Sequence, residues 1–125
     1  MPITYTIDQE KRLVICTGFG LCTADDVLGC HAQLAKDAGF DPSFSQLVDG
    51  TAITQTTVTA SQMRALAGES PFSLGSRRAF VVDSPLGFGL SRIYQIVRSL
   101  RGDRHIRVFH SRGEAMAWLL KERSV

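Results

Sequence analysis

The stretch RAFVVDSPLGFGLSRIYQIV, residues 78–97, contains the structural unit that decides the fold. Its first five residues include a run of apolar side chains, which is typical of a strand buried on both faces. Ser84 is a good N-cap, and Pro85 is preorganised for the first position of a helix. We therefore predict a buried strand that leads directly into a helix running from Pro85 to about Arg101.

The amino-terminal residues predict a β-hairpin. Residues 3–7 alternate between apolar and polar side chains, and a polar turn follows at residues 8–10. Residues 12–17 are more apolar, so we expect this second strand to be the more deeply buried one. We expect it to end at the tripeptide formed by residues 18–20.

Three further helix starts carry the pattern of a capping box. In each, a serine or threonine stands three residues before an acid or an amide: Thr23 with Asp26, Thr59 with Gln62, and Ser111 with Glu114. We expect the first of these helices to end at Gly39. The remaining strands are predicted at residues 45–49 and 104–109, with a threonine-rich loop at residues 51–57.

These elements follow the order ββαβαβαβα. Strands that alternate with helices pair mostly in parallel. We predict an α/β fold with a five-stranded, mostly parallel sheet whose first strand lies antiparallel at an edge. The chain has no internal repeat, linker or low-complexity tract, so we expect one domain over residues 1–125.

The composition is that of an ordinary soluble globule, with 44% hydrophobic and 21% charged residues. No apolar run approaches the ~18 residues that a membrane span requires, and the first residues lack the layout of a signal peptide. We expect a cytoplasmic protein without a membrane span. Its three cysteines, Cys16, Cys22 and Cys30, are expected to be reduced and mainly buried. The alternative is a reactive thiol at Cys22, because the following helix start would lower its pKa.

The net charge of +2 hides an asymmetry between the two halves of the chain. Residues 1–63 carry three basic and seven acidic side chains, a net charge of −4, whereas residues 64–125 carry eleven basic and five acidic ones, a net charge of +6. Aromatic residues interleaved with the basic ones, as in single-strand binders, are nearly absent. We therefore favour solvated helix faces and pairing between the halves or between subunits, and we expect no nucleic-acid partner.

Gly87 and Gly89 do not form a nucleotide-binding loop. The G-x-G-x-x-G fingerprint has Arg92 in place of its third glycine, and no Gly-Lys-Ser or Gly-Lys-Thr of a Walker loop is present. We expect both glycines to let the helix approach the sheet closely. The predicted packing face of this helix consists of Leu86, Gly89, Leu90, Ile93, Ile96, Val97 and Leu100.

Phe88 falls on the opposite side of this helix, among polar residues. A phenylalanine left in water forgoes roughly 1.5–3 kcal/mol of burial. Phe88, Arg92 and Gln95 therefore form a candidate contact surface for a ligand, a lipid or another subunit. The alternative is a loop that folds over Phe88.

A candidate ligand site lies where two predicted strands end. Open α/β sheets bind ligands beyond the carboxyl ends of their strands. The residues that follow these two strands are Asp49, Thr51, Asp83, Ser84 and Gly87. We expect them to contact a small ligand, or else to cap the adjacent turns and helices.

No pattern indicates a catalytic or metal centre. His31 lies on an apolar helix face with no acid one turn away, so we expect a core histidine. His105 and His110 are five residues apart on one predicted strand and point to opposite faces. We therefore assign no catalytic residue, no metal and no cofactor. An enzyme that uses Ser84, Cys22 or His31 is the less favoured alternative, because the G-x-S-x-G motif is missing and no base has a readable spacing.

Four stretches carry a family resemblance through their order along the chain: TADDV (23–27), FSQLVDGTAIT (44–54), RRAFVVDSPLGFGLSRIYQ (77–95) and IRVFHSRGEAMAWL (106–119). In this order the chain resembles the bacterial SpoIIAA-like proteins, which are related to the STAS domains of anti-sigma-factor antagonists. The resemblance implies a five-stranded α/β domain with a non-enzymatic role. It also implies that partner proteins or small ligands are bound, and a distant kinship with lipid-carrying domains is compatible with an apolar ligand.

One departure concerns the phosphorylation switch of the antagonists. Their Asp-Ser-Ser-Gly type motif is absent here, although Thr59 and Ser61 stand near the corresponding place. We expect a binding or regulatory domain that acts through protein contacts, including self-association, or through a small ligand. A carrier or sensor of a small apolar or lipid-like molecule is the alternative.

Overall fold

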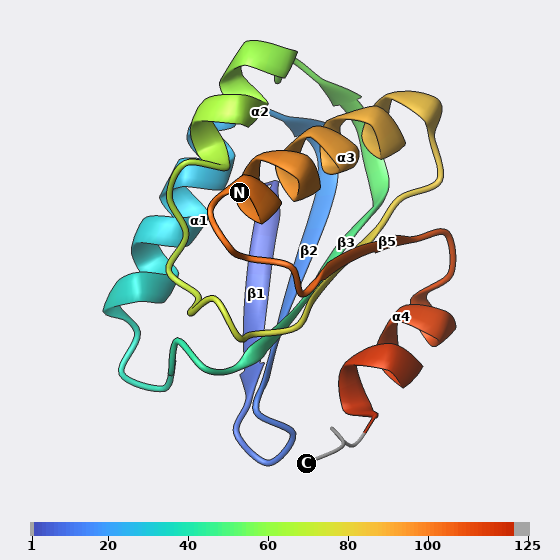
Figure 1. Ribbon diagram of the computed structural model, residues 1–125. Coiled ribbons are helices and arrows are strands. Elements are labelled where there is room, and N and C mark those ends of the chain that lie inside the picture. The colour runs from blue at the N-terminus through green and yellow to red at the C-terminus, as the bar shows by residue number, and fades with distance from the viewer. Residues whose placement is uncertain (1, 122–125) are drawn as a thin grey trace.

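The computed structural model describes residues 2–121 as a five-stranded sheet with helices on both faces (Figure 1). The strands lie in the order β1-β2-β3-β4-β5, with β1 antiparallel to β2 and all other pairs parallel. This confirms the predicted α/β fold with an antiparallel edge strand. The elements are β1 (Ile3–Asp8), β2 (Leu13–Cys22), α1 (Ala24–Lys36), β3 (Ser45–Thr56), α2 (Ala60–Leu66), β4 (Arg78–Val81), α3 (Pro85–Leu100), β5 (Ile106–Phe109) and α4 (Arg112–Leu120).

Helices α1, α2 and α3 cover one face of the sheet, and α4 covers the other (Figure 1). From β2 to β5 the strand order advances in one direction. Right-handed crossovers then place every connecting helix on the same side. No crossover constrains α4, whose Ala115 and Leu119 pack against Leu47 and Val81 on the opposite face.

Two strands are longer than predicted. β2 continues through Gly18, Phe19 and Gly20 to Cys22, and β3 continues through the expected threonine-rich loop to Thr56. The two extensions pair with each other, with register shifts after Thr17 and after Gly20. Glycine in a strand often marks such an irregularity, and Gly20 has a positive φ of 65°. The prediction that these glycines end the strand was therefore wrong.

The predicted helix starts are confirmed. Thr23 and Thr59 each form a complete capping box, and the hydroxyls of Ser84 and Ser111 accept from the backbone amides of Gly87 and Glu114. The end of α1 differs from the prediction. It stops at Lys36, three residues before the expected Gly39, and Asp37 is its C-cap.

The structure buries one group of charges that the sequence pattern did not reveal. Arg78 is 0% exposed and forms an ion pair with the equally buried Asp103. Arg98 contacts the same carboxylate, with Nη2 at 3.0 Å from Oδ2. We call these three residues the arginine–aspartate cluster. Arg112 pairs with Asp49 at 3.0 Å, which confirms that some of the basic residues pair with the acidic half of the chain.

Candidate functional site

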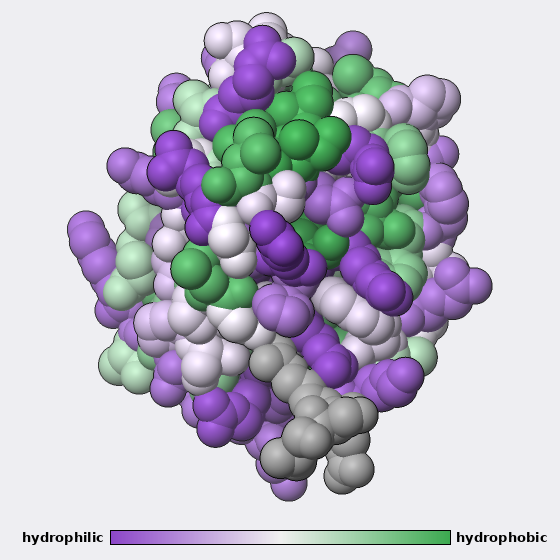
Figure 2. All heavy atoms as spheres, viewed as in Figure 1, coloured by the Kyte–Doolittle hydropathy of each residue, from purple (hydrophilic) through white to green (hydrophobic). Residues whose placement is uncertain are grey.

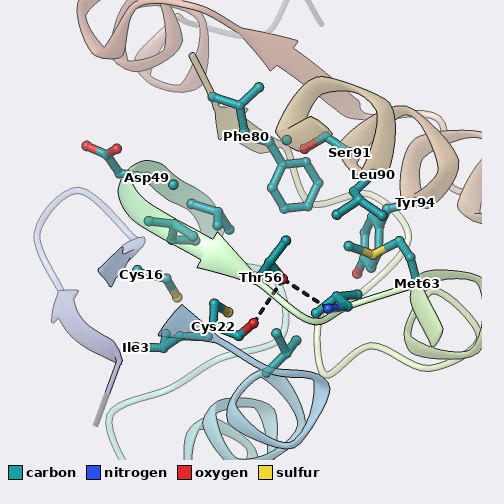
Figure 3. Close-up of a pocket in the computed structure, with 18 of the residues that line it drawn as sticks. Ile3, Cys16, Cys22, Asp49, Thr56, Met63, Phe80, Leu90, Ser91 and Tyr94 are labelled. Atoms are coloured by element: carbon teal, nitrogen blue, oxygen red, sulfur yellow. Dashed lines mark hydrogen bonds between the residues drawn. The ribbon is translucent and has the colours of Figure 1, made fainter. Parts of the chain in front are cut away.

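A cavity of about 340 Å³ lies between the sheet and helices α1, α2 and α3 (Figure 3). Its wall is mainly apolar, and the aliphatic and aromatic side chains around it come from the sheet and from all three helices. They include Ile3, Val27, Val48, Ile53, Val58, Met63, Leu66, Phe80, Val82, Leu86 and Leu90. Helices on one face thus leave a space that their side chains do not fill.

Small residues make room for this cavity. Ser91 faces it from the middle of α3, and Gly18 lines it from β2, where a Cβ would approach the side chain of Ile53 to 2.8 Å. At Gly87 a Cβ would lie 2.9 Å from the Ser84 hydroxyl and 3.3 Å from Val82, so the close approach predicted here is present. A Cβ at Gly89 would meet no atom within 4 Å, and the close packing predicted for this glycine was wrong.

The floor of the cavity is buried and carries polar groups. Cys16, Gln46 and Tyr94 are all less than a tenth exposed. The Gln46 amide donates to the Cys16 sulfur at 3.2 Å, and the Tyr94 ring packs edge-on against Phe80 at 5.2 Å. His31 from α1 also faces this space. Burial lowers the pKa of His31, and the charge of Arg78 acts in the same direction, so the imidazole is held in its neutral form.

The rim lies at the carboxyl ends of the central strands. Thr54, Gln55, Ser84 and Leu86 line the cavity and are exposed to solvent. β3 alone runs from the floor at Gln46 to this rim, and a strand rises roughly 3.3 Å per residue. The cavity is therefore a deep space with a wet end and a dry end.

The predicted ligand-site residues divide into two groups. Asp49, Ser84 and Gly87 line the cavity, whereas Thr51 and Asp83 are exposed and do not. Asp49 lies within β3 and not at its end, which corrects the predicted strand boundary. Its carboxylate points away from the centre of the cavity in Figure 3 and accepts from the Thr51 hydroxyl at 2.7 Å.

Asp49 is held in its charged form by these contacts. Burial raises the pKa of Asp49, but hydrogen bonds from Thr51 and from Arg112 outweigh it, and the pKa is lowered. Asp49 therefore joins β3 to α4 and contributes backbone to the cavity wall, while its charge faces the opposite side of the sheet.

The surroundings of Cys22 do not favour an activated thiol. Burial raises the pKa of Cys22, and the charge of Asp26 raises it further, which argues against the alternative of a reactive thiol at this position. The neighbouring Cys30 thiol and burial likewise raise the pKa of Cys16. All three cysteines are buried and free, as predicted.

The predicted contact residues on α3 lie near β5. Phe88 is 39% exposed and stacks on the ring of His110, with the ring centroids 5.6 Å apart. Arg92 donates to the side-chain oxygen of Gln95, and Gln95 donates to the carbonyl of Ile106 at 2.7 Å. Phe88 is therefore partly covered by His110 and partly exposed, and Gln95 joins α3 to β5 through a hydrogen bond.

The buried face of α3 is not the face predicted from its apolar residues. The side chains that point inward are those of Leu90, Ser91, Tyr94 and Arg98. Much of the predicted packing face is turned outward, with Leu86 57%, Ile96 51% and Leu100 83% exposed. Arg98 and Ser91 can be buried because Arg98 meets Asp103 and the Ala67 carbonyl, and Ser91 faces the cavity. Figure 2 shows apolar side chains gathered on the surface over α2 and α3.

Sequence reasoning missed most of the cavity. Cys16, Gln46, Ser91 and Tyr94 were not singled out as site residues, and His31 was expected in the core. One signal was present: Gln46 directly precedes the apolar pair Leu47 and Val48 in a predicted strand, and Ser91 directly follows Leu90 in a predicted helix. A polar residue at such a position needs either a partner or a space to face.

No protein-family model and no curated protein matches the chain. Among solved structures, the chain is similar to an uncharacterized protein of the DUF3478 family with a SpoIIAA-like fold, from Shewanella loihica PV-4. The two chains superpose with a TM-score of 0.57 and 18% sequence identity, over 94% of this chain and 91% of the other. The protein is therefore an α/β protein with a SpoIIAA-like fold, which confirms the resemblance at the level of the fold.

Two absences hold for the part of the chain that the structure describes. Within residues 2–121, no helix combines the length and the apolar character needed to cross a lipid bilayer. The same residues contain no cluster of three or more histidine, cysteine or acidic side chains that could hold a metal ion.

Proposed function

We propose that the protein binds a small, predominantly apolar molecule in the interior cavity and acts as its carrier or sensor. The observation that carries this proposal is the cavity of about 340 Å³ with its mainly apolar wall. Small-molecule sites are typically about 300–1,000 Å³, apolar and furnished with a few polar groups. An apolar cavity of about 150 Å³ already accepts benzene.

The polar groups around the cavity favour binding over catalysis. The Ser84 hydroxyl accepts from the Gly87 amide at the start of α3. Burial keeps the Cys22 thiol protonated, since its pKa is raised. Among the described residues, no serine or cysteine forms a hydrogen bond with a histidine, which a Ser–His or Cys–His catalytic pair would require. These contacts support the proposal that the protein is not an enzyme.

Native mass spectrometry of freshly purified protein tests the proposal. We expect a co-purified apolar ligand, or an increase in melting temperature with members of a panel of fatty acids, alcohols, sterols and quinones. Ser91→Phe fills the cavity and should abolish both effects. Ser99→Phe, on the same helix but outside the cavity wall, is the matched control and should preserve them. Binding that is equal in the two variants would place the ligand elsewhere and overturn the proposal.

A second candidate function is self-association through α3. Leu86, Gly89, Ile93, Ile96 and Leu100 follow the alternating spacing of three and four residues that lets two helices pack along a seam. Open space around Gly89 permits close approach of another helix. The partner that this strip favours is a second copy of the chain, because a two-fold axis presents the same strip from both subunits.

Sedimentation of three proteins tests self-association. We expect the wild type to form a dimer and Ile96→Asp to shift it to a monomer, whereas Phe88→Asp should leave the dimer in place. A monomer with Phe88→Asp and a dimer with Ile96→Asp would instead assign the contact to the surface of Phe88, Arg92 and Gln95. A wild type that is monomeric at every concentration would exclude this second function.

A further inference from the structure

The arginine–aspartate cluster carries an excess positive charge inside the protein. Two guanidinium groups, from Arg78 and Arg98, share the single carboxylate of Asp103. Arg78 is fully buried, and its Nε has no hydrogen-bond partner among the described residues. One buried charge is therefore left over, and a charge in a protein interior is costly unless it meets an opposite one.

This cluster lies immediately behind the floor of the cavity. Arg78 is paired in register with Gln46 of β3, and Gln46 lines the floor. Arg78 is also two residues from Phe80, so that both side chains point to the same face of the sheet. Arg98 lies one turn along α3 from Tyr94, which is itself a floor residue. His31, which lines the cavity, lies close enough to Arg78 for the Arg78 charge to add to the effect of burial in lowering the pKa of His31.

No negative charge of the described lining residues offsets it within the cavity. Asp49 is the one acid among them, and its carboxylate points outward and is paired with Arg112. The other polar side chains at the floor, His31, Gln46 and Tyr94, are neutral groups that are able to donate hydrogen bonds. The cavity thus has an apolar wall, a wet rim and a dry floor that lies next to the excess positive charge of the arginine–aspartate cluster.

We propose that the ligand is an amphipathic monoanion, an alkyl or aryl carboxylic acid, whose carboxylate lies at the floor among His31, Gln46 and Tyr94. This deepens the proposed function and depends on it. The carboxylate would complement the single excess charge of the cluster, and the apolar chain would extend along β3 toward the rim at Thr54 and Leu86. A monoanion matches one surplus charge, whereas a dianionic phosphate would bring one negative charge too many.

The first experiment compares ligands that share one chain on the delipidated wild-type protein. Decanoic acid, decanol, methyl decanoate and decyl phosphate are titrated by displacement of a fluorescent apolar probe. We expect the acid to bind about tenfold more tightly than the alcohol and the ester, because only the acid has a charge to meet the cluster. Equal binding of all four overturns the inference but leaves the proposed function intact. If none of the four ligands binds, both the inference and the proposed function are overturned. If decyl phosphate binds most tightly, the head group is a phosphate and not a carboxylate, and the inference is overturned.

The second experiment removes the charge. In Arg78→Met, the remaining Arg98 and Asp103 form a neutral pair, and decanoic acid should lose its advantage over decanol while decanol binding is unchanged. Arg78→Lys retains the charge and should retain the preference. Tyr94→Phe keeps the three charges of the cluster and removes only the Tyr94 hydroxyl, which also interacts with the Arg78 guanidinium. This variant tests the floor in case Arg78→Met does not fold, and it should weaken binding of the acid more than that of the alcohol. A preference for the acid that survives both Arg78→Met and Tyr94→Phe would contradict the proposal.

Discussion

The two faces of the sheet are formed by the same strands but differ in how completely side chains fill the space above them. On the α4 face, Leu13, Leu47, Ala79 and Val81 are at most 1% exposed and pack directly against Ala115 and Leu119. On the face covered by α1, α2 and α3, the alternate positions are occupied by residues such as Cys16, Gln46 and Phe80, and they surround a cavity. One short helix thus packs densely, whereas three longer connections leave a space. The comparison indicates that side chains fill the α4 face completely, whereas part of the other face is left open with room for a ligand.

We expect a large loss of stability when the acid of the arginine–aspartate cluster is removed. Asp103→Asn leaves two buried guanidinium groups without an acid, and we expect a loss of about 3–5 kcal/mol of unfolding free energy. Asp49→Asn breaks a pair whose arginine is half exposed, and the expected loss is about 0–1 kcal/mol. Urea denaturation of the two variants measures the difference. Similar losses would show that the arginine–aspartate cluster is not an obligatory part of the folded core.

The next comparison truncates one leucine on each face of the sheet. Leu47→Ala removes a side chain from the dense α4 face, and we expect a loss of about 3–5 kcal/mol. Leu90→Ala removes the same atoms from a side chain that already borders the cavity, so we expect a smaller loss of unfolding free energy, about 2 kcal/mol. The same denaturation experiment compares them. If Leu90→Ala proved the more damaging change, the cavity would not be a region of low packing density.

Two glycines on α3 distinguish its inner and outer sides. Gly87→Ala brings a Cβ against the Ser84 hydroxyl and Val82, and we expect a destabilisation of about 1–2 kcal/mol. Gly89→Ala adds a methyl group in open space, and should stabilise the monomer by about 0.5–1 kcal/mol through helix propensity. Thermal unfolding at low protein concentration checks both signs. A destabilising Gly89→Ala would mean that the outer side of α3 is covered.

The smallest effect concerns His31. Because burial lowers its pKa in the folded protein, the unfolded chain binds more protons as the pH falls through the ordinary histidine value of 6.5. Stability should therefore be complete above that pH and decline below it. We expect His31→Gln to reduce the slope of unfolding free energy against pH between neutral and mildly acidic conditions. The same slope in both proteins would show that His31 is as well solvated in the folded state as in the unfolded one.

Local sequence patterns predicted where the helices begin but not which side of α3 is buried. Thr23, Thr59, Ser84 and Ser111 were identifiable as caps because a cap depends on residues within one turn of itself. The choice of face on α3 was misjudged because the more apolar side of the helix was assumed to be the buried one. Arg98 occupies the buried side only because Asp103, a residue from beyond the helix, neutralises it.

The residues of the candidate site likewise divide into some that the sequence predicted and others that it did not. Ser84 and Gly87 were predicted from the rule that ligands bind at the strand ends, and both do line the cavity. The floor was not predictable, because it is formed by β2, β3, α1 and α3, which come together only when the sheet is assembled. Gln46 next to Arg78 is a pairing between strands, and no spacing along the chain specifies it.

The amino-acid sequence by itself determined the order of strands and helices, the antiparallel edge strand and the start of each helix, because these depend on side-chain periodicity and on contacts between near neighbours. Tertiary structure alone decided that β2 and β3 extend past the expected turns, that the apolar strip of α3 faces outward and that a cavity forms over a buried positive charge. These outcomes depend on which distant groups meet, since the free energy of burying an arginine or leaving a space is set by its partners and not by its neighbours in sequence.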